Sequence, residues 1–244
     1  MAALLGTPLV IHEQNSVPGL ANRVLAGVAD RVLCAFPGAL KRATHTGNPV
    51  RPDILAIPAP EARYAGRTGP LRVLVVGGSL GAKALNEIVP QALALLPGAA
   101  WPIVTHQSGP QHADSLKRAY AEAKMRASTP AFIDDMAAAY SETDLVVCRA
   151  GATTVAELAA AGVPSILVPY PHAVDDHQTR NARFLADAGA AVLVPQSELT
   201  PQRLADLISG FDRKRLCEMA LRARALGRPG ATEAVAKACM DLAQ

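Results

Sequence analysis

A glycine-rich turn at residues 77–82 of this 244-residue chain has the composition of a phosphate-binding loop. It reads GGSLGA and stands between an apolar run and a stretch of helical spacing. Glycine lets a backbone approach an anion closely, a helix start offers unpaired N–H groups, and the Ser79 hydroxyl adds a donor. An ordinary strand-to-helix turn explains the same letters, because the spacing is not the dinucleotide G-x-G-x-x-G and no acidic residue ends a second strand to hold a ribose.

A second turn, RAGATTVAE at 149–157, has the same position between an apolar run and a helix. Gly151 permits a sharp turn, Thr153 and Thr154 are suited to cap the helix, and the free N–H groups would face a diphosphate. Glu157 lies one turn further on, where a carboxylate accepts hydrogen bonds from vicinal ribose hydroxyls. Helix capping alone, with Glu157 as a partner of the helix dipole, is the alternative. Two phosphate-type turns in one sheet favour a nucleotide diphosphate.

A third motif, PYPHAVDDHQTRN at 169–181, is too polar to be packing. Its prolines fix the loop, and His177, Gln178 and Asn181 supply neutral donors and acceptors suited to sugar hydroxyls. A metal site at Asp175, Asp176 and His177 is disfavoured, because adjacent side chains diverge at a helix start. A polar N-cap is the simpler interpretation.

Two further polar clusters have structural and functional interpretations. The pair Asp134-Asp135 precedes an apolar helix at 136–140, where capping is favoured over a metal, and the backbone of Ile133 is placed to contact a base edge. The run HEQN at 12–15 ends a buried strand, so its side chains either face a cleft or pair internally.

The segments that position these motifs alternate between two patterns of apolar residues, one typical of buried strands and one typical of helices. Short Val-, Ile- and Leu-rich runs alternate with stretches of three-to-four spacing, which predicts βαβ units, a doubly wound parallel sheet and a ligand crevice at the carboxyl ends of the strands. The expected strands are 71–76, 144–148, 165–168 and 191–194, and the expected helices are 82–96, 111–124, 153–161, 177–188 and 201–209.

The first 45 residues form a different piece, with strands at 8–12 and 31–35 around a helix near 20–29. These elements cannot cover a core on their own, so we expect the end of a domain whose beginning is absent. The expected division is this remnant at 1–45, a Pro- and Gly-punctuated linker with a short helix at 46–70, a Rossmann-like domain at 71–226, and a C-terminal helix at 227–244 that packs back on the N-terminal part.

Composition excludes several classes of protein. Half the residues are hydrophobic and 18% are charged, which suits a folded core. A net charge of +3 and 4% aromatic residues leave little material for a nucleic-acid surface. The four cysteines lack CxxC spacing, and we expect buried thiols rather than a metal site. No apolar run reaches spanning length and no signal peptide is recognisable, which predicts a cytoplasmic protein.

In order along the chain, HEQN, PGLANRVL, TGNPVR, VLVVGGSLGA, FIDDMAAAY and the run from Asp144 to Asn181 resemble the MurG family of GT-B glycosyltransferases. The resemblance implies two Rossmann-like domains with a cleft between them. It implies transfer of N-acetylglucosamine from UDP-GlcNAc to an undecaprenyl-diphosphate-linked N-acetylmuramyl pentapeptide (lipid I to lipid II), at the cytoplasmic face of the membrane, for peptidoglycan synthesis. It implies no cofactor and no metal.

The resemblance also implies roles for particular residues. The diphosphate would lie near Ser79 and the helix start, the ribose on Glu157, the uracil between Ile133 and Arg51, and the sugar on Gln178 with His177 beside it. The complete implied substrate-binding set is Asn15, Arg51, Ser79, Ile133, Ala152, Thr153, Thr154, Val155, Ala156, Glu157, His177 and Gln178.

One family motif is missing from these 244 residues. The second glycine-rich loop, GGTGGH, whose histidine is the family's usual candidate base, does not occur. We therefore expect that this chain lacks the N-terminal part of the family's sequence and carries the donor site without activity of its own. No catalytic residue is predicted within it. A UDP-GlcNAc 2-epimerase-like GT-B enzyme and a non-catalytic nucleotide-sugar-binding fragment are the alternatives.

Overall fold

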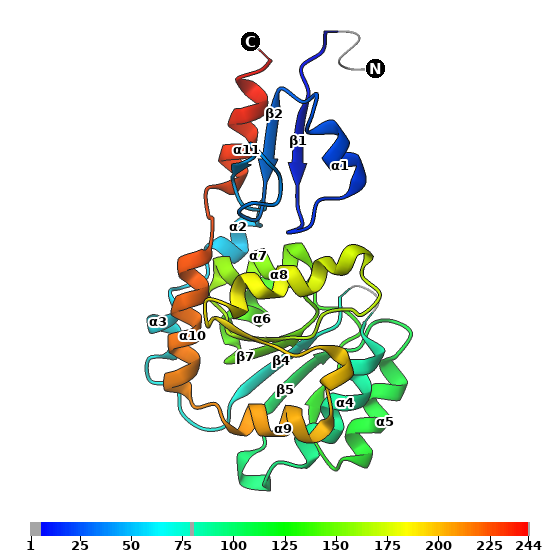
Figure 1. Cartoon of the computed structure of the whole chain (residues 1–244). Helices are drawn as coiled ribbons and strands as arrows, with labels where there is room; N and C mark the ends of the chain where they lie inside the picture. Colours follow the sequence, from blue (N-terminus) through cyan, green and yellow to red (C-terminus); the bar gives the residue numbers. More distant parts are fainter. Residues whose placement is uncertain (1–5, 79–80, 244) are drawn as a thin grey trace.

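The computed structural model describes residues 6–78 and 81–243, and within them the chain forms two parallel sheets (Figure 1). The larger sheet has the order β6-β5-β4-β7-β8-β9. Its order reverses between β4 and β7, which is where a doubly wound sheet opens a crevice. The strands of this sheet are β4 (Arg72–Val76), β5 (Ile103–Gln107), β6 (Ala127–Ser128), β7 (Leu145–Cys148), β8 (Ser165–Leu167) and β9 (Ala191–Leu193).

Helices cover both faces of the larger sheet because its strands are apolar on both sides. Val73 and Val75 of β4 pack into one core with α4, α5 and α9, whereas Leu74 packs into the opposite core with α7 and α8. The helices of this domain are α4 (Lys83–Ala94), α5 (Ala113–Glu122), α6 (Met136–Glu142), α7 (Ala152–Ala161), α8 (His177–Ala186), α9 (Pro201–Ser209) and α10 (Arg213–Leu226). Short 3₁₀ helices cover Gly98–Ala100, Val174–Asp176 and Gln196–Glu198.

The smaller sheet consists of β1 (Val10–Glu13), β2 (Arg31–Cys34) and β3 (Thr44–His45). Helix α1 (Leu20–Leu25) lies on one side of it and α11 (Ala231–Met240) on the other (Figure 1). No residue of α1 is buried. At the turn before α11, Arg228 contacts His45 at 3.4 Å.

The segment between the sheets packs on the larger domain. It contains α2 (Pro52–Leu55) and α3 (Pro60–Tyr64), and Ile54 is fully buried. The Tyr64 hydroxyl donates to the Asp144 carbonyl at 2.7 Å. The residues predicted as a linker therefore contribute to the core.

The predicted α/β architecture is confirmed, and each predicted strand and helix corresponds to an observed one. Strands β3, β5 and β6 were not predicted from the sequence. Strand β5 reads IVTHQ and carries polar residues at its end, and the other two are two residues long, so none presents a long apolar run. The predicted helix near 20–29 is shorter, ending at Leu25.

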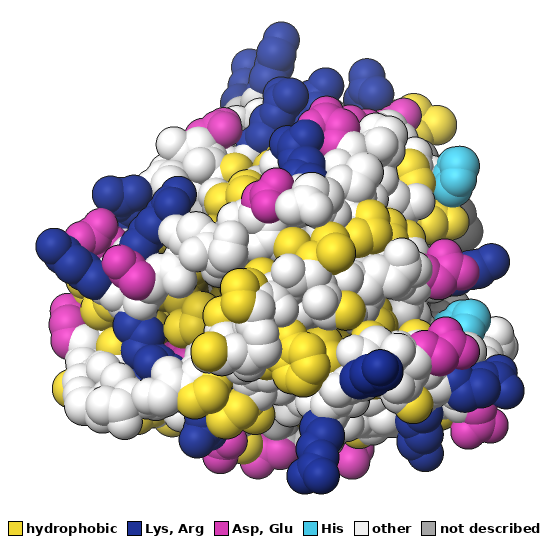
Figure 2. Space-filling view, turned by 90° about the horizontal axis from the view of Figure 1, so that it is seen from below, with side chains coloured by type: hydrophobic (Ala, Val, Ile, Leu, Met, Phe, Trp, Pro, Cys, Tyr) yellow, Lys and Arg dark blue, Asp and Glu magenta, His cyan; other side chains and the backbone are white. Residues whose placement is uncertain are grey.

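The face of the larger domain turned away from the small sheet is mixed in character. Figure 2 shows apolar side chains across its middle and side chains of both charge signs around its rim. No helix within residues 6–78 and 81–243 is long and apolar enough to cross a bilayer.

Candidate functional site

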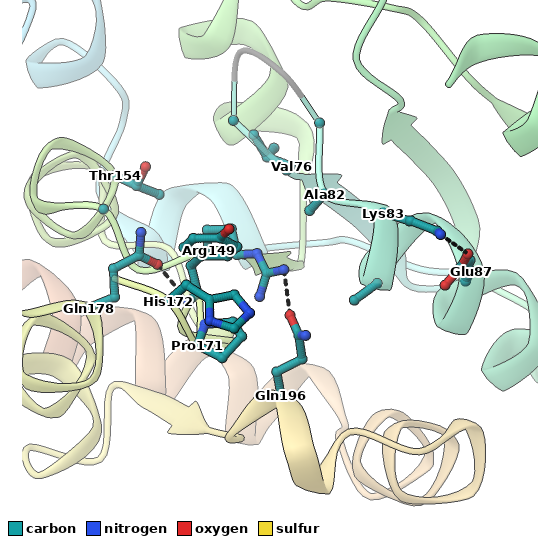
Figure 3. A pocket seen from close by; sticks show the side chains of 16 residues that line it. Val76, Ala82, Lys83, Glu87, Arg149, Thr154, Pro171, His172, Gln178 and Gln196 are labelled. Atoms are coloured by element: carbon teal, nitrogen blue, oxygen red, sulfur yellow. Dashed lines mark hydrogen bonds and ion pairs between the residues drawn. The ribbon is translucent and has the colours of Figure 1, made fainter. Parts of the chain in front are cut away.

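A cavity of about 800 Å³ opens at the reversal of strand order, between the carboxyl ends of β4 and β7. Pockets of this size hold a nucleotide or a drug-sized ligand. In Figure 3, Thr154 and Gln178 lie on one side of the cavity, Lys83 and Glu87 on the other, and Arg149 between them. The lining residues are Val76, Gly77, Gly78, Gly81, Ala82, Lys83, Ala84, Glu87, Arg149, Gly151, Thr154, Tyr170, Pro171, His172, Gln178 and Gln196.

The glycine-rich turn forms one wall and requires its glycines. A Cβ on Gly77 would lie 2.3 Å from the Ala82 nitrogen, and Gly78 has a φ of +89°. The buried Gln107 side chain holds the turn, because its carbonyl oxygen accepts the Gly77 N–H at 3.2 Å and its amide donates to the Gly78 carbonyl at 2.9 Å. Ser79 lies outside the described residues, so its predicted phosphate contact stays a prediction.

The start of α7 forms the opposite wall. Gly151 is the N-cap residue, and no side-chain hydrogen bond caps the helix. The expectation that Thr153 and Thr154 cap it is therefore wrong, because both lie inside the first turn. Thr154 lines the cavity, whereas Thr153 is exposed. A helix start without a side-chain cap keeps N–H donors available for an anion.

Gln178 joins two walls of the cavity. Its side-chain oxygen accepts the N–H of Ala150 at 3.3 Å and of Tyr170 at 2.9 Å. The oxygen thus already accepts hydrogen bonds from the protein backbone. The amide N–H₂ is the part of this side chain suited to donate to a sugar hydroxyl. His177 is not among the lining residues; its carbonyl accepts the Ser16 hydroxyl at 3.5 Å.

Glu157 belongs to a neighbouring cluster rather than to the cavity wall. The buried Tyr140 hydroxyl donates to one of its oxygens at 3.2 Å, and an Arg51 nitrogen lies 3.8 Å from the other. Burial raises the pKa of Glu157, although the Tyr140 hydrogen bond and the Arg51 charge act in the opposite direction. Ile133 is partly buried against the same core. Arg51 and Glu157, predicted for the uracil and the ribose, thus lie next to each other.

The polar run at 12–15 both pairs internally and faces the larger domain. Buried Glu13 accepts from the Asn15 and Gly19 N–H groups and from the Asn22 amide, at 2.8 to 3.1 Å. Asn15 accepts from the Asn181 amide at 3.2 Å. Asn181 also donates to the Ala150 carbonyl at 3.2 Å, so the end of β1 meets the diphosphate-type turn.

The predicted capping role of the aspartate pair is confirmed for Asp135, whose carboxylate accepts the Ala138 N–H at 2.8 Å. Asp176 occupies the N-cap position of α8, but its side chain accepts from the Thr179 hydroxyl instead of capping the helix. Within the described residues, no group of three or more His, Cys, Asp or Glu side chains is placed to hold a metal ion.

Three of the lining residues, Arg149, His172 and Gln196, were not predicted as site residues from the sequence. The sequence pattern could have indicated Arg149 as a site residue, because it directly follows β7, whose four residues are all buried. A charged residue at the end of such a strand points to the crevice. No sequence pattern indicated Gln196, since it lies 47 residues from Arg149, whose guanidinium it contacts.

A doubly wound parallel domain with a switch-point cavity, and a smaller parallel sheet packed across the same edge, is the arrangement of GT-B glycosyltransferases. The profile of the "Glycosyltransferase family 28 C-terminal domain" matches residues 72–237. CalG4, a calicheamicin glycosyltransferase, shares the fold, with a TM-score of 0.61 at 15% identity over 97% of this chain and 70% of its own.

Closer relatives narrow the class. The UDP-N-acetylglucosamine–N-acetylmuramyl-(pentapeptide) pyrophosphoryl-undecaprenol N-acetylglucosamine transferase of Ralstonia nicotianae is 61% identical over 247 residues, covering 100% of this chain and 68% of that protein. The crystal structure of MurG from Acinetobacter baumannii matches with a TM-score of 0.89 at 45% identity, covering 98% of this chain and 68% of that one. This chain belongs to the MurG family of N-acetylglucosaminyltransferases.

Proposed function

We propose that this chain binds UDP-GlcNAc in the cavity between β4 and β7, as the donor half of an enzyme that transfers N-acetylglucosamine to a lipid-linked muramyl pentapeptide. The observation that carries the proposal is the meeting of three motifs in one crevice. The glycine-rich turn, the uncapped start of α7 and Gln178 all line the same cavity. The names of the close relatives support the donor and the acceptor.

In this proposal the nucleotide extends from the cavity to the cluster beside α7. The diphosphate binds the N–H groups at the start of α7 and the turn that contains Ser79. The ribose hydroxyls donate to Glu157, and the uracil lies between Arg51 and the backbone of Ile133. Gln178, beside His177, binds the sugar, and Asn15 completes the rim. Ala152, Val155 and Ala156 contribute through the helix backbone.

The reaction is an inverting displacement in which this chain stabilises the leaving group. A base removes the proton of the acceptor hydroxyl, the hydroxyl oxygen attacks the anomeric carbon, and the bond from that carbon to the diphosphate oxygen breaks with its electron pair leaving on UDP. Uncapped N–H groups at the start of α7 stabilise the charge that grows on the diphosphate, because their dipoles are already oriented. No nucleophile from the protein is required.

We propose no sugar transfer by residues 1–244 alone. The family's base-bearing motif is not in this sequence, so we propose that these residues bind the donor but do not glycosylate the acceptor. We also propose that the chain divides into an N-terminal remnant (1–45), a linker (46–70), a Rossmann-like donor domain (71–226) and a C-terminal helix (227–244). The complete enzyme would associate peripherally with the cytoplasmic membrane face.

Two measurements test this function. Calorimetric titration with UDP-GlcNAc, UDP and GDP should show binding of both uridine nucleotides and much weaker binding of GDP. Incubation with labelled UDP-GlcNAc, with and without lipid-linked muramyl pentapeptide, should give no transfer by these residues. Absence of UDP binding contradicts the donor site, and release of N-acetylmannosamine with UDP in the absence of acceptor supports an epimerase instead.

A further inference from the structure

Gln107 is a buried amide side chain at the carboxyl end of β5, and it does not itself line the cavity. Val76, the last residue of β4, is its partner in the sheet register. The Gln107 side chain therefore lies where β4 continues into the glycine-rich turn. Its carbonyl oxygen accepts the Gly77 N–H at 3.2 Å, and its amide nitrogen donates to the Gly78 carbonyl at 2.9 Å. Both glycines line the cavity, so Gln107 holds this wall from the protein side.

The same amide nitrogen also holds a second segment of backbone. It donates to the Ala131 carbonyl at 3.2 Å, and the Gly109 N–H donates to that carbonyl at 3.2 Å as well. Ala131 lies two residues before Ile133, whose backbone is the proposed contact of the uracil. One side chain thus connects the turn proposed for the diphosphate with the segment proposed for the base.

Close backbone packing leaves the turn little room to shift. A Cβ on Gly81 would lie 2.1 Å from the Ser108 carbonyl oxygen. The Ser108 N–H donates to the Pro130 carbonyl at 3.0 Å. Residues 107–109 therefore contact both the glycine-rich turn and residues 130–131, and they set the distance between these two segments.

The contacts of the Gln107 side chain require a glutamine. They need one acceptor and an N–H₂ group with two donors at the end of a side chain of this length. A glutamate would place a carboxylate against the Gly78 and Ala131 carbonyl oxygens. A methionine of similar length would leave both carbonyls and the Gly77 N–H without this partner. A substitution here should therefore move the turn relative to the base segment without changing any residue that would contact the nucleotide.

We propose that Gln107 is a positioning residue of the donor site, which fixes the distance between the glycine-rich turn and the segment that carries Ile133. A uridine nucleotide can then bind to both segments at once. The inference rests on the proposed function, because it takes the diphosphate and the uracil as the ligands of these two segments. Ligands that occupy only one of the segments do not need this distance, whereas UDP does.

Three ligands measured on the same variants separate this role from a structural one. Uridine occupies the base segment, inorganic pyrophosphate the turn and the start of α7, and UDP all of them. Calorimetry, or NMR titration for the weak ligands, gives each affinity. Gln107→Met should weaken UDP binding by about 10- to 100-fold, because the two ends of UDP no longer fit their segments together. Uridine and pyrophosphate should each lose less than about threefold, because neither spans both segments.

Tyr120→Phe is the matched control for Gln107→Met. It removes a buried hydrogen bond to His106, the residue next to Gln107 in β5. This variant should melt earlier than the parent and bind all three ligands as the parent does. A loss of UDP affinity in Gln107→Met that is no larger than the product of the losses for uridine and pyrophosphate would overturn the inference while the proposed function stands. A parent chain that binds neither UDP nor uridine contradicts both.

Gln107→Glu covers the case in which Gln107→Met does not fold, and it adds a pH profile. A protonated carboxyl has an acceptor oxygen and an O–H donor, so it restores the contact with Gly77 and one of the two carbonyl contacts. The ionised form has no donor. The UDP affinity of this variant, taken relative to the parent at the same pH, should be highest at acidic pH and fall as the carboxyl ionises. A relative affinity that is reduced equally at every pH would also overturn the inference.

Discussion

The hydroxyl of Tyr140 in α6 donates to a carboxylate oxygen of Glu157 in α7 at 3.2 Å, and this bond fixes the orientation of a partly buried acid beside the candidate site. Tyr140 is fully buried, so its hydroxyl has no access to water as an alternative partner. Arg51 approaches the second carboxylate oxygen at 3.8 Å from the segment between the sheets. Glu157 thus receives contacts from two elements while part of it remains accessible to a ligand.

Replacing Glu157 by glutamine tests its proposed ribose contact. The substitution keeps the shape and removes the charge, and hydrogen bonds to a charged group contribute roughly 1.5 to 3 kcal/mol. UDP binding should weaken by about one to two powers of ten. A role limited to the helix dipole instead predicts a loss of about 0.3 to 1 kcal/mol in stability with UDP affinity nearly unchanged.

Titration calorimetry and a melting curve of the same Glu157→Gln sample distinguish these outcomes. Deoxy-UDP is the control ligand, because the parent should bind it less tightly than UDP and the variant should discriminate less. Tyr140→Phe is the matched variant, since it removes one hydrogen-bond donor and leaves the carboxylate. A Glu157→Gln variant that melts earlier but binds UDP like the parent contradicts the ribose contact.

The raised pKa of Glu157 predicts opposite pH dependences for binding and stability. Ribose hydroxyls donate to the ionised form, so UDP affinity should rise as pH increases through the raised pKa. The contribution of Glu157 to stability should fall over the same range, because a carboxyl whose pKa is higher in the folded state favours folding in its protonated form. Calorimetry and urea denaturation across the acidic range measure both, and Glu157→Gln should flatten both curves. Parallel curves in parent and variant would assign the titration to another group.

The sequence predicted the alternation of the larger sheet because its central strands are buried on both faces and hence continuously apolar. It did not predict β5, where polar Thr105, His106 and Gln107 interrupt the pattern. Tertiary contacts explain them: His106 contacts the Tyr120 hydroxyl at 2.9 Å, and Gln107 holds the glycine-rich turn. Thr154 and Gln178 were assigned from their motifs, whereas the contact of Arg149 with Gln196 joins residues 47 positions apart, which no local pattern encodes.

The exposed side of α1 predicts self-association of this chain. Leu20 and Val24 of α1 and Val28 in the turn that follows it are 76%, 66% and 58% exposed, and an exposed apolar surface favours association. Leu20→Lys combined with Val24→Lys should lower the apparent mass in concentrated solution with little change in melting temperature, because neither side chain is buried. Light scattering over a concentration series measures it. The matched control is Lys substitution of exposed Leu221 in α10, and an effect of equal size there would contradict a specific role for α1.

Asn181 is predicted to couple the two sheets energetically. It is fully buried, and its side-chain oxygen accepts the Ser16 N–H at 2.9 Å and the Ser16 hydroxyl at 2.8 Å, while its amide donates to Asn15 and to the Ala150 carbonyl. Asn181→Ala leaves these four groups without their hydrogen-bond partner, which lowers the free energy of unfolding by about 1 to 3 kcal/mol.

Urea denaturation of the parent, Asn181→Ala, Ser16→Ala and the double variant measures the coupling free energy between Asn181 and Ser16. We expect about 0.5 to 3 kcal/mol for residues in direct contact. Gln202→Ala, which breaks an exposed bond to Asp206, is the control and should leave the midpoint unchanged. Additive effects of the Asn181 and Ser16 substitutions would show that the contact between the sheets does not contribute to stability.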